Sequence, residues 1–440
     1  MTWKPPLLPD HYAAGESQKS MIYSYLLFLW YVRLDRTGVL LESYFAVSAQ
    51  YENFKQKVFT GSAEVFLSLG QDIHSGRATA KQDWEKLFST MGYTKYLNNP
   101  KGEMIKRELK EAMLLAFDPD RIAEADSILK HPATITNMPL VLRQNICRLA
   151  RKREEADSFL LHTDFLTLLY RANEKTKKYL PERAWSSNPL LNDLFLIATI
   201  PDASVRDHAI FLDLNLALSM QEEELVDLFA HEFFHNYREM AYQGSSGDSF
   251  LNAFDLFQNE GIADLIDKKR NDDKIMQFFG DEFVKAYKEE LANAPNTLAR
   301  IDSLSIAFDP NTSQDGEYKP VADLVLFGGH PVGYYMASLI QEQGYMRELI
   351  DNYDNPVVFA TLYNQAARKK NAVSKGREYI LSDHLIGHLK QAYKKQEGKQ
   401  NDIKENRNTT LSGIANRCNF HRPVLRFLGI EVFTIFASYK

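Results

Sequence analysis

The chain contains 440 residues, of which 45% are hydrophobic and 25% are charged. This composition is typical of a globular protein with a large buried core, and the length allows two or three domains. The formal net charge is -6, with basic residues interspersed among acidic ones, so nucleic acid is not expected as a partner. The two cysteines, Cys147 and Cys418, are too few for a disulfide framework or a thiolate zinc cluster. A metal site would therefore use histidines and carboxylates.

The N-terminal segment, residues 1–59, has features of a leader sequence. It contains an apolar run at 21–32 and, at 46–50, small residues typical of a signal-peptide cleavage site. Charged residues lie between these two features, and the run is too short to span a bilayer comfortably. An export signal and a buried or interfacial helix are both open interpretations, and no stable membrane span is expected. The compartment is therefore left open between the cytoplasm and export.

The rest of the chain alternates between helical and strand-like patterns. Apolar residues three and four positions apart run through 60–185, which we predict to be a helical domain. Pro, Ser and Asn gather at 180–189 and indicate the boundary of a second domain at 186–393. This domain begins with two short apolar segments, 194–200 and 208–218, which we predict to be strands of a small sheet separated by a turn at 201–207. The predicted fold class is therefore α+β and predominantly helical.

A helix with an unusual histidine pair follows the second predicted strand. Ser219 and Glu222 match the S-x-x-E capping box, so this helix is predicted to begin there and to run to about Tyr242. It carries the sequence H-E-x-x-H, in which His231 and His235 lie one turn apart on the same face. The alternative is an ordinary half-buried helix whose histidines have no special role.

Two imidazoles at this spacing can bind one Zn²⁺, provided that a third ligand is found. Glu232 directly follows the first histidine and is positioned to act on a metal-bound water rather than to bind the metal closely. Glu260, on a later predicted helix, would complete a His₂Glu set with one position open for water. Asp264, one turn further on, is expected to accept the second N–H of a ligand histidine. The small Gly261 would let this helix pack closely against the motif helix.

The combination of H-E-x-x-H with N-E-x-x-[SA]-D resembles the gluzincin clan of zinc metallopeptidases, of which thermolysin is the best-known member. The matching positions are His231, Glu232, His235, Asn259, Glu260, Ala263 and Asp264. Over about residues 60–390 the chain is also similar to a group of uncharacterised bacterial zinc-dependent peptidases. The resemblance implies a zincin-like catalytic domain with one Zn²⁺ per chain. It also implies that the strand at 208–216 forms the edge of the sheet on which an extended peptide substrate lies. Motifs that mark the thermolysin and aminopeptidase branches are absent, so substrate preference is not implied.

A second histidine motif, "GGHPVGYYMA" at 328–337, lies further along the chain. Pro331 suits the first turn of a helix, so His330 would lie at its start with Tyr334 one turn on. Hydrolysis of an amide develops negative charge on the carbonyl oxygen, and both side chains are candidate hydrogen-bond donors to that oxygen. The alternative is a capping histidine and a packed tyrosine.

The sequence thus predicts a zinc-dependent peptidase that hydrolyses peptide bonds with a zinc-activated water and with Glu232 as general base. The metal ligands are predicted to be His231, His235 and Glu260, and the partner a peptide or protein substrate. Two alternatives stay open: a zinc hydrolase of a non-peptide amide or ester, and a non-catalytic binding protein with a zincin-like fold. The polar residues at 394–410 are predicted to form a solvated linker within the C-terminal segment 394–440. The oligomeric state is left open.

Overall fold

The computed structural model describes residues 57–131, 137–185, 193–206, 209–241, 247–308, 318–374 and 378–411. The predicted leader features before residue 57 and the C-terminal tail beyond residue 411 lie outside the described residues. Residues 56–440 form one compact unit, which contains every described helix and strand. The predicted domain boundary near residue 185 falls inside this unit and stays a prediction.

The sheet has four described strands. They are β1 (Val58–Phe59), β2 (Asp193–Ile197), β3 (Ala203–Arg206) and β4 (Ala209–Asp213), in the order β1-β2-β4-β3. β1, β2 and β4 run parallel, and β3 is antiparallel to β4. β2 and β4 are almost entirely buried, as expected for parallel strands covered on both faces.

One aromatic side chain from each parallel strand packs across the sheet. The ring of Phe195 stacks on Phe59 at a centroid distance of 4.6 Å and on Phe211 at 5.3 Å. These three residues are direct neighbours in the strand register, so the stack follows from the pairing of the strands. It helps to fix β2 between its two neighbours.

The two predicted strands are confirmed in position but not in extent. The segment predicted at 208–218 forms β4 and then turns into a short helix, α12 (Leu214–Leu218). Asp213 causes the change, because its side chain accepts a hydrogen bond from the Leu216 N–H and caps the helix. The interval between the predicted strands, expected to be only a turn, contains β3.

The expectation that residues 208–216 form the edge of the sheet is wrong. β4 pairs with β2 on one side and with β3 on the other, so its backbone groups are already used. Among the described strands, β3 instead pairs with a single neighbour and forms the edge next to β4. The helix of the H-E-x-x-H motif packs against β3, so this edge strand adjoins the motif.

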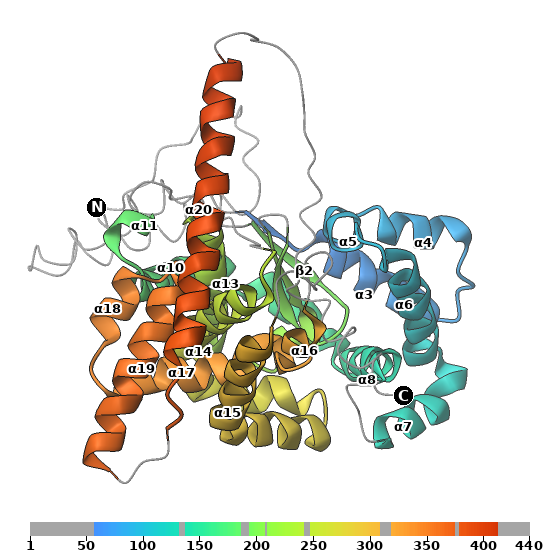
Figure 1. The fold of residues 1–440 in the computed structure, drawn as a ribbon. Coiled ribbons are helices and arrows are strands. Elements are labelled where there is room, and N and C mark those ends of the chain that lie inside the picture. Colours follow the sequence, from blue (N-terminus) through green and yellow to red (C-terminus); the bar gives the residue numbers. More distant parts are fainter. Residues whose placement is uncertain are drawn as a thin grey trace, which may run out of the picture. The chain divides into compact units, whose positions relative to one another are not determined.

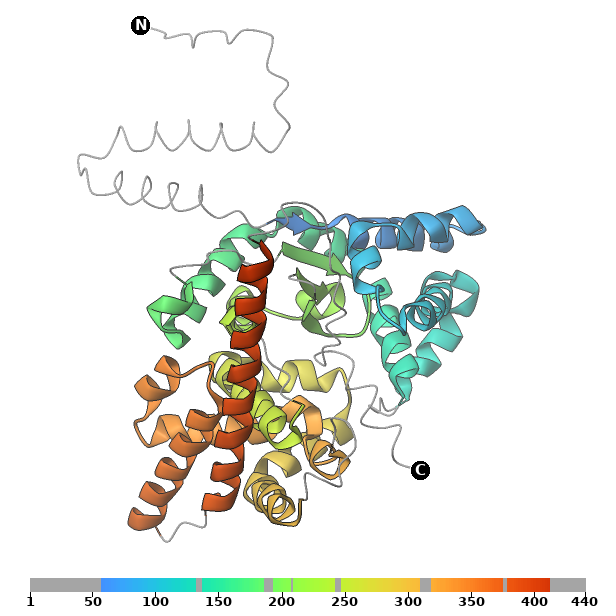
Figure 2. The same cartoon turned by 45° about the horizontal axis from the view of Figure 1, so that its top comes forward.

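The helical pattern of residues 60–185 is confirmed. In Figures 1 and 2 the helices α3 to α7, blue to teal, lie to one side of the sheet, and the yellow to red helices lie to the other. The helices before β2 are α3 (Gly61–His74), α4 (Lys81–Phe88), α5 (Met91–Tyr96), α6 (Gly102–Phe117), α7 (Ile122–Lys130), α8 (Met138–Arg151), α9 (Arg153–His162), α10 (Phe165–Thr176) and α11 (Glu182–Trp185), with short 3₁₀ turns at Pro119–Arg121 and Lys177–Tyr179.

The helices after the sheet build the region around the histidine motifs. They are α13 (Glu222–Ala241), α14 (Ser249–Gln277), α15 (Asp281–Ala307), α16 (Lys319–Ala322), the 3₁₀ segment η3 (Leu326–Gly329), α17 (His330–Glu342), α18 (Met346–Asp351), α19 (Pro356–Val373) and α20 (Asp383–Leu411). α14 is central among them, because it packs against α13, α17 and α19. No helix in the described part of the chain is long and apolar enough to cross a membrane.

The segment at 394–410, predicted to be a linker, continues α20 as a helix to Leu411 (Figure 1). Its lysines, glutamates and glutamines are good helix formers, so a polar helix can extend without an apolar face. The polar sequence of this segment predicted a solvated linker. The segment is a helix instead, because many of its residues favour helix formation.

α14 and α17 cross at two glycines. A Cβ atom on Gly261 would lie 2.3 Å from the carbonyl oxygen of Gly333, and one on Gly333 would lie 2.4 Å from that of Phe257. Only glycine permits so close an approach of two helix backbones. Gly261 therefore packs against α17, whereas the sequence analysis expected it to serve the contact with the motif helix.

Candidate metal centre

The motif helix α13 begins at Glu222, two residues later than a cap at Ser219 would start it. Ser219 is the C-cap of α12, and its hydroxyl donates to the Leu216 carbonyl at 2.7 Å. The N-terminus of α13 is instead capped by Glu224, whose carboxylate accepts a hydrogen bond from the backbone N–H of Gln221 at 2.7 Å. Ser219, predicted to be the N-cap of the motif helix, therefore ends α12 instead. The S-x-x-E spacing alone does not distinguish these two roles.

α10 supports the back of the motif helix. The Thr176 hydroxyl donates to the carbonyl of Ala230 at 2.9 Å, directly before the first motif histidine. Further along α13, the Tyr237 hydroxyl donates to the Asn173 side chain at 2.8 Å. The helical region before the sheet therefore helps to fix the orientation of α13.

The histidines of α13 and the glutamate of α14 face one another in the protein interior. Nε2 of His235 lies 3.3 Å from Oε2 of Glu260, and Nε2 of His231 lies 3.8 Å from the same oxygen. The side chain of Glu260 is only 1% exposed. The structure thus brings together the three residues that the sequence analysis predicted as metal ligands.

His330 joins this group from α17. Its Nε2 lies 3.3 Å from Oε2 of Glu260, the same distance as that of His235. One ligand atom from each of His231, Glu260 and His330 lies within 4.8 Å of the other two, which is close enough to share a metal ion. The sequence predicts His330 near the site as a hydrogen-bond donor to the substrate, and that role stays a prediction.

The other ring nitrogen of each histidine faces an oxygen acceptor on α14. Nδ1 of His231 lies 3.1 Å from Asp267. Nδ1 of His235 lies 3.1 Å from the side-chain oxygen of Asn259. Asp264, expected to serve a ligand histidine, lies 3.7 Å from Nδ1 of His231 but only 3.0 Å from Nδ1 of His330.

Asp267 was missed by the sequence analysis. It lies on the same face of α14 as Asp264, three positions further on, and is 2% exposed. An acidic residue three positions after Asp264, on a helix where Glu260 and Asp264 are already candidates, is a signal that the sequence contains. Only the direction in which the motif helix crosses α14 decides that His231 meets Asp267 rather than Asp264.

The charges of the site are strongly coupled. Burial alone would raise the pKa of Glu260, but His235 and His330 hold it well below its ordinary value. Burial likewise lowers the pKa of His235, yet the Glu260 carboxylate outweighs this effect and raises it to about 9. Lys268, with its ammonium 3.4 Å from Asp264, is a partly buried cation among these carboxylates. The carboxylates still outnumber the fixed cations, so the site attracts positive charge.

Glu232 is buried beside the two histidines of its own helix. Burial raises its pKa to about 7, and the nearby carboxylates of Asp202 and Glu260 act in the same direction. Asp202 directly precedes the edge strand β3. A carboxyl group with a pKa near neutrality can accept and return a proton at physiological pH.

The comparison with known families agrees with this geometry. A family model described as "Putative zinc dependent peptidase (DUF5700)" matches residues 84–372, which is more than half of the chain and includes every candidate site residue. The chain belongs to this family. No curated protein and no solved structure shows a significant match. Among these comparisons, only the family's description links the chain to zinc and to peptidase activity.

In this family member the donor set fits a divalent cation. Each imidazole has its Nδ1 against an oxygen acceptor, which holds one proton there, and its Nε2 faces the Glu260 carboxylate. A divalent cation bound among these atoms would take the place of protons on Nε2, because a metal-bound imidazole must give up that proton. Imidazole nitrogens with a carboxylate are ligands that suit Zn²⁺.

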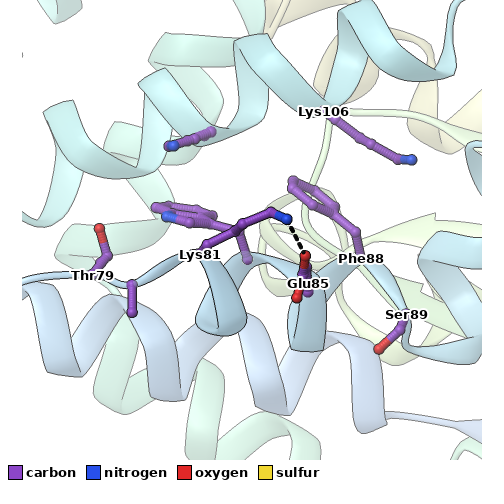
Figure 3. A pocket seen from close by; sticks show the side chains of 9 residues that line it. Thr79, Lys81, Glu85, Phe88, Ser89 and Lys106 are labelled. Atoms are coloured by element: carbon purple, nitrogen blue, oxygen red, sulfur yellow. Dashed lines mark ion pairs between the residues drawn. The ribbon is translucent and has the colours of Figure 1, made fainter.

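Tyr334 lies one turn after His330 on α17 and is half-buried. The family member also has a pocket of about 620 Å³ elsewhere, between α4 and α6, lined by Lys81, Trp84, Phe88 and Lys106 among others (Figure 3). None of the candidate site residues lines this pocket. This pocket is therefore separate from the histidine cluster.

Proposed function

We propose that this protein is a zinc-dependent peptidase of the gluzincin type, with its metal centre between α13, α14 and α17. The observation that carries the proposal is the convergence of imidazole Nε2 atoms on the buried Glu260 carboxylate, with every Nδ1 oriented by an acceptor. His231, His235 and Glu260 would hold the ion, as the H-E-x-x-H and N-E-x-x-A-D motifs suggest.

A bound Zn²⁺ supplies Lewis-acid chemistry, which makes water a nucleophile near neutral pH and polarises a carbonyl group. Glu232 accepts the proton of the attacking water and then delivers it to the leaving amine. Its pKa of about 7 suits both steps, since the group is neither permanently charged nor permanently protonated at neutral pH. Tyr334 is a proposed donor to the carbonyl oxygen as negative charge develops there.

The edge strand β3 is the proposed support for the substrate. The strand packs against α13, and Asp202, directly before it, lies close enough to His231 and His330 to interact with their charge. An extended peptide can add to such an edge through backbone hydrogen bonds, which requires no particular side chains. This mode of binding would direct a peptide carbonyl toward Glu232.

Peptide cleavage in the presence and absence of chelator tests the proposal. Full-length protein is incubated with a peptide library, and products are identified by mass spectrometry before chelation, after chelation and after zinc is restored. We expect cleavage to disappear with chelator and to return with zinc. Cleavage that survives complete removal of metal would contradict a zinc mechanism.

The variant Glu232→Gln separates chemistry from metal binding. It keeps the size of the side chain but removes the proton acceptor, so we expect a folded, zinc-loaded protein. Its hydrolytic rate should fall by at least about a hundredfold, the usual scale for loss of a general base. A zinc-loaded variant with the wild-type rate would refute the role of Glu232. A zinc-loaded wild type that cleaves no peptide would favour a non-peptide amide or ester substrate, or a binding protein.

A further inference from the structure

The strand proposed to support the substrate ends in a basic side chain. Arg206 is the last residue of β3, and Asp202 directly precedes the first. We propose that Arg206 is a specificity-determining residue, which binds an acidic side chain of the peptide substrate. This inference rests on the proposed function, because it takes β3 as the strand on which the substrate lies.

The pairing of β3 leaves its outer edge for a bound peptide. Among the described strands, β3 pairs with β4 alone, from Ala203 opposite Leu212 to Arg206 opposite Ala209. A peptide that adds to the outer edge would lie beside β3 as a further strand. Residues opposite each other in a sheet direct their side chains to the same face. The peptide residue opposite Arg206 would therefore direct its side chain to the face that carries the guanidinium.

The guanidinium of Arg206 is held in one orientation. It lies over the ring of Tyr96, 4.3 Å from the ring centroid. That ring is buried, packs against Phe211 at a centroid distance of 5.5 Å, and has its hydroxyl 3.4 Å from the donating hydroxyl of Thr199. Stacking uses the flat face of a guanidinium and leaves the N–H groups at its edge able to donate. Such an oriented group suits a carboxylate, which can accept two parallel hydrogen bonds.

The charge of Arg206 also favours an acidic partner. Among the described residues, no carboxylate lies within ion-pair distance of Arg206, although Arg206 opposes the rise that burial causes in the pKa of Asp202. The side chain is half-buried, so solvent screens its charge less than that of a fully exposed cation. A substrate carboxylate would therefore gain more from Arg206 than from an ordinary surface cation.

Strand geometry gives the position of the selected residue in the peptide. Arg206 lies four positions after Asp202, which corresponds to about 13 Å along an extended strand. Asp202 interacts with the charges of His231 and His330, so its end of β3 is the end near the proposed metal centre. The selected Asp or Glu should therefore lie roughly three to five residues from the scissile bond.

Peptide binding to a zinc-loaded protein that does not cleave tests the inference. Full-length Glu232→Gln is titrated with fluorescent peptides that differ at one position, which carries Glu, Gln or Lys, and this position is moved along the peptide. Fluorescence anisotropy gives the dissociation constants. At one position we expect the Glu peptide to bind about tenfold more tightly than the Gln peptide. When Arg206→Gln is added, this preference should fall below about twofold.

Two further variants separate selectivity from a structural role. Arg206→Lys keeps the charge but loses the planar guanidinium, so only part of the preference should remain. This variant decides the question if Arg206→Gln does not fold, and a full preference in it would contradict the proposal. Arg183→Gln removes a cation that also stacks on a tyrosine, Tyr353 at 5.5 Å, but lies in α11, so the full preference should remain.

The outcomes distinguish a failure of the inference from a failure of the proposed function. Equal binding of Glu and Gln peptides at every position, or a Glu preference that survives Arg206→Gln, would overturn the inference and leave the proposed function intact. A zinc-loaded protein that neither binds nor cleaves any peptide would overturn both.

Discussion

At the residue scale, the chemistry of the site depends on which acceptor faces each imidazole. Asp267, Asn259 and Asp264 each take one Nδ1–H, and all three lie on α14 together with Glu260. One helix therefore carries the proposed carboxylate ligand together with the three groups that accept from the histidines. A change in any of these acceptors should alter metal affinity without removing a ligand.

Asp267 offers the clearest test of this arrangement. Asp267→Asn keeps the shape of the side chain but weakens the acceptor behind His231, so zinc affinity should fall by roughly ten- to a hundredfold. Affinity is measured by competition with a chelator. Asp255→Asn, on the same helix but bonded to Arg238, is the matched control and should keep wild-type affinity even if it lowers stability. Equal affinities in the two variants would show that Asp267 does not support the site.

At the element scale, the close crossing of α14 and α17 brings His330 to Glu260. At this crossing Gly261 and Gly333 remove the side chains that would hold the helices apart. The obstacle to a larger residue is a backbone carbonyl, which no rotamer change can move aside. The distance between the two helices is therefore determined by these two positions.

Gly333→Ala should separate the helices. The added methyl group would meet the Phe257 carbonyl at 2.4 Å, so we expect the free energy of unfolding to fall by about 2–3 kcal/mol, in the upper range for overpacking. Zinc affinity should fall as well, because the same contact pushes on α14, the helix that carries Glu260. Urea denaturation and chelator competition measure the two effects.

Gly387→Ala is the control for that substitution. Gly387 is also helical, in α20, but a Cβ atom there would meet nothing within 4 Å. Replacement by alanine should raise stability by about 0.5–1 kcal/mol through helix propensity and leave zinc affinity unchanged. Equal stability changes in the two variants would mean that the glycine crossing does not restrict the helices.

At the scale of the whole molecule, the proposed metal centre connects helices that are far apart in the sequence. α13 and α14 carry the proposed ligands, α17 places His330 beside Glu260, and α10 supports α13 from the other side. Because an ordered site exists only in the folded state, the binding free energy of the metal adds to the stability of the fold.

Removal of metal should therefore destabilise the protein. We expect chelator to lower the melting temperature of the full-length protein, and added zinc to restore it in a concentration-dependent way. His235→Ala should melt at the lower temperature with or without chelator. Differential scanning calorimetry measures these transitions, and a wild-type melting temperature that is insensitive to chelator would argue against a metal shared by these helices.

The sequence by itself determined the features that depend on neighbouring residues. Helical periodicity predicted the helices from residue 60 onward, and one-turn spacing placed His231 and His235 on a common face, because helix geometry is set by local hydrogen bonds. The tertiary structure decided which partners these residues meet. The pairing of Asp267 with His231, the arrival of His330 beside Glu260 and the edge position of β3 depend on helix crossings and strand order. Those are set by the packing of segments distant in the chain, which no local pattern encodes.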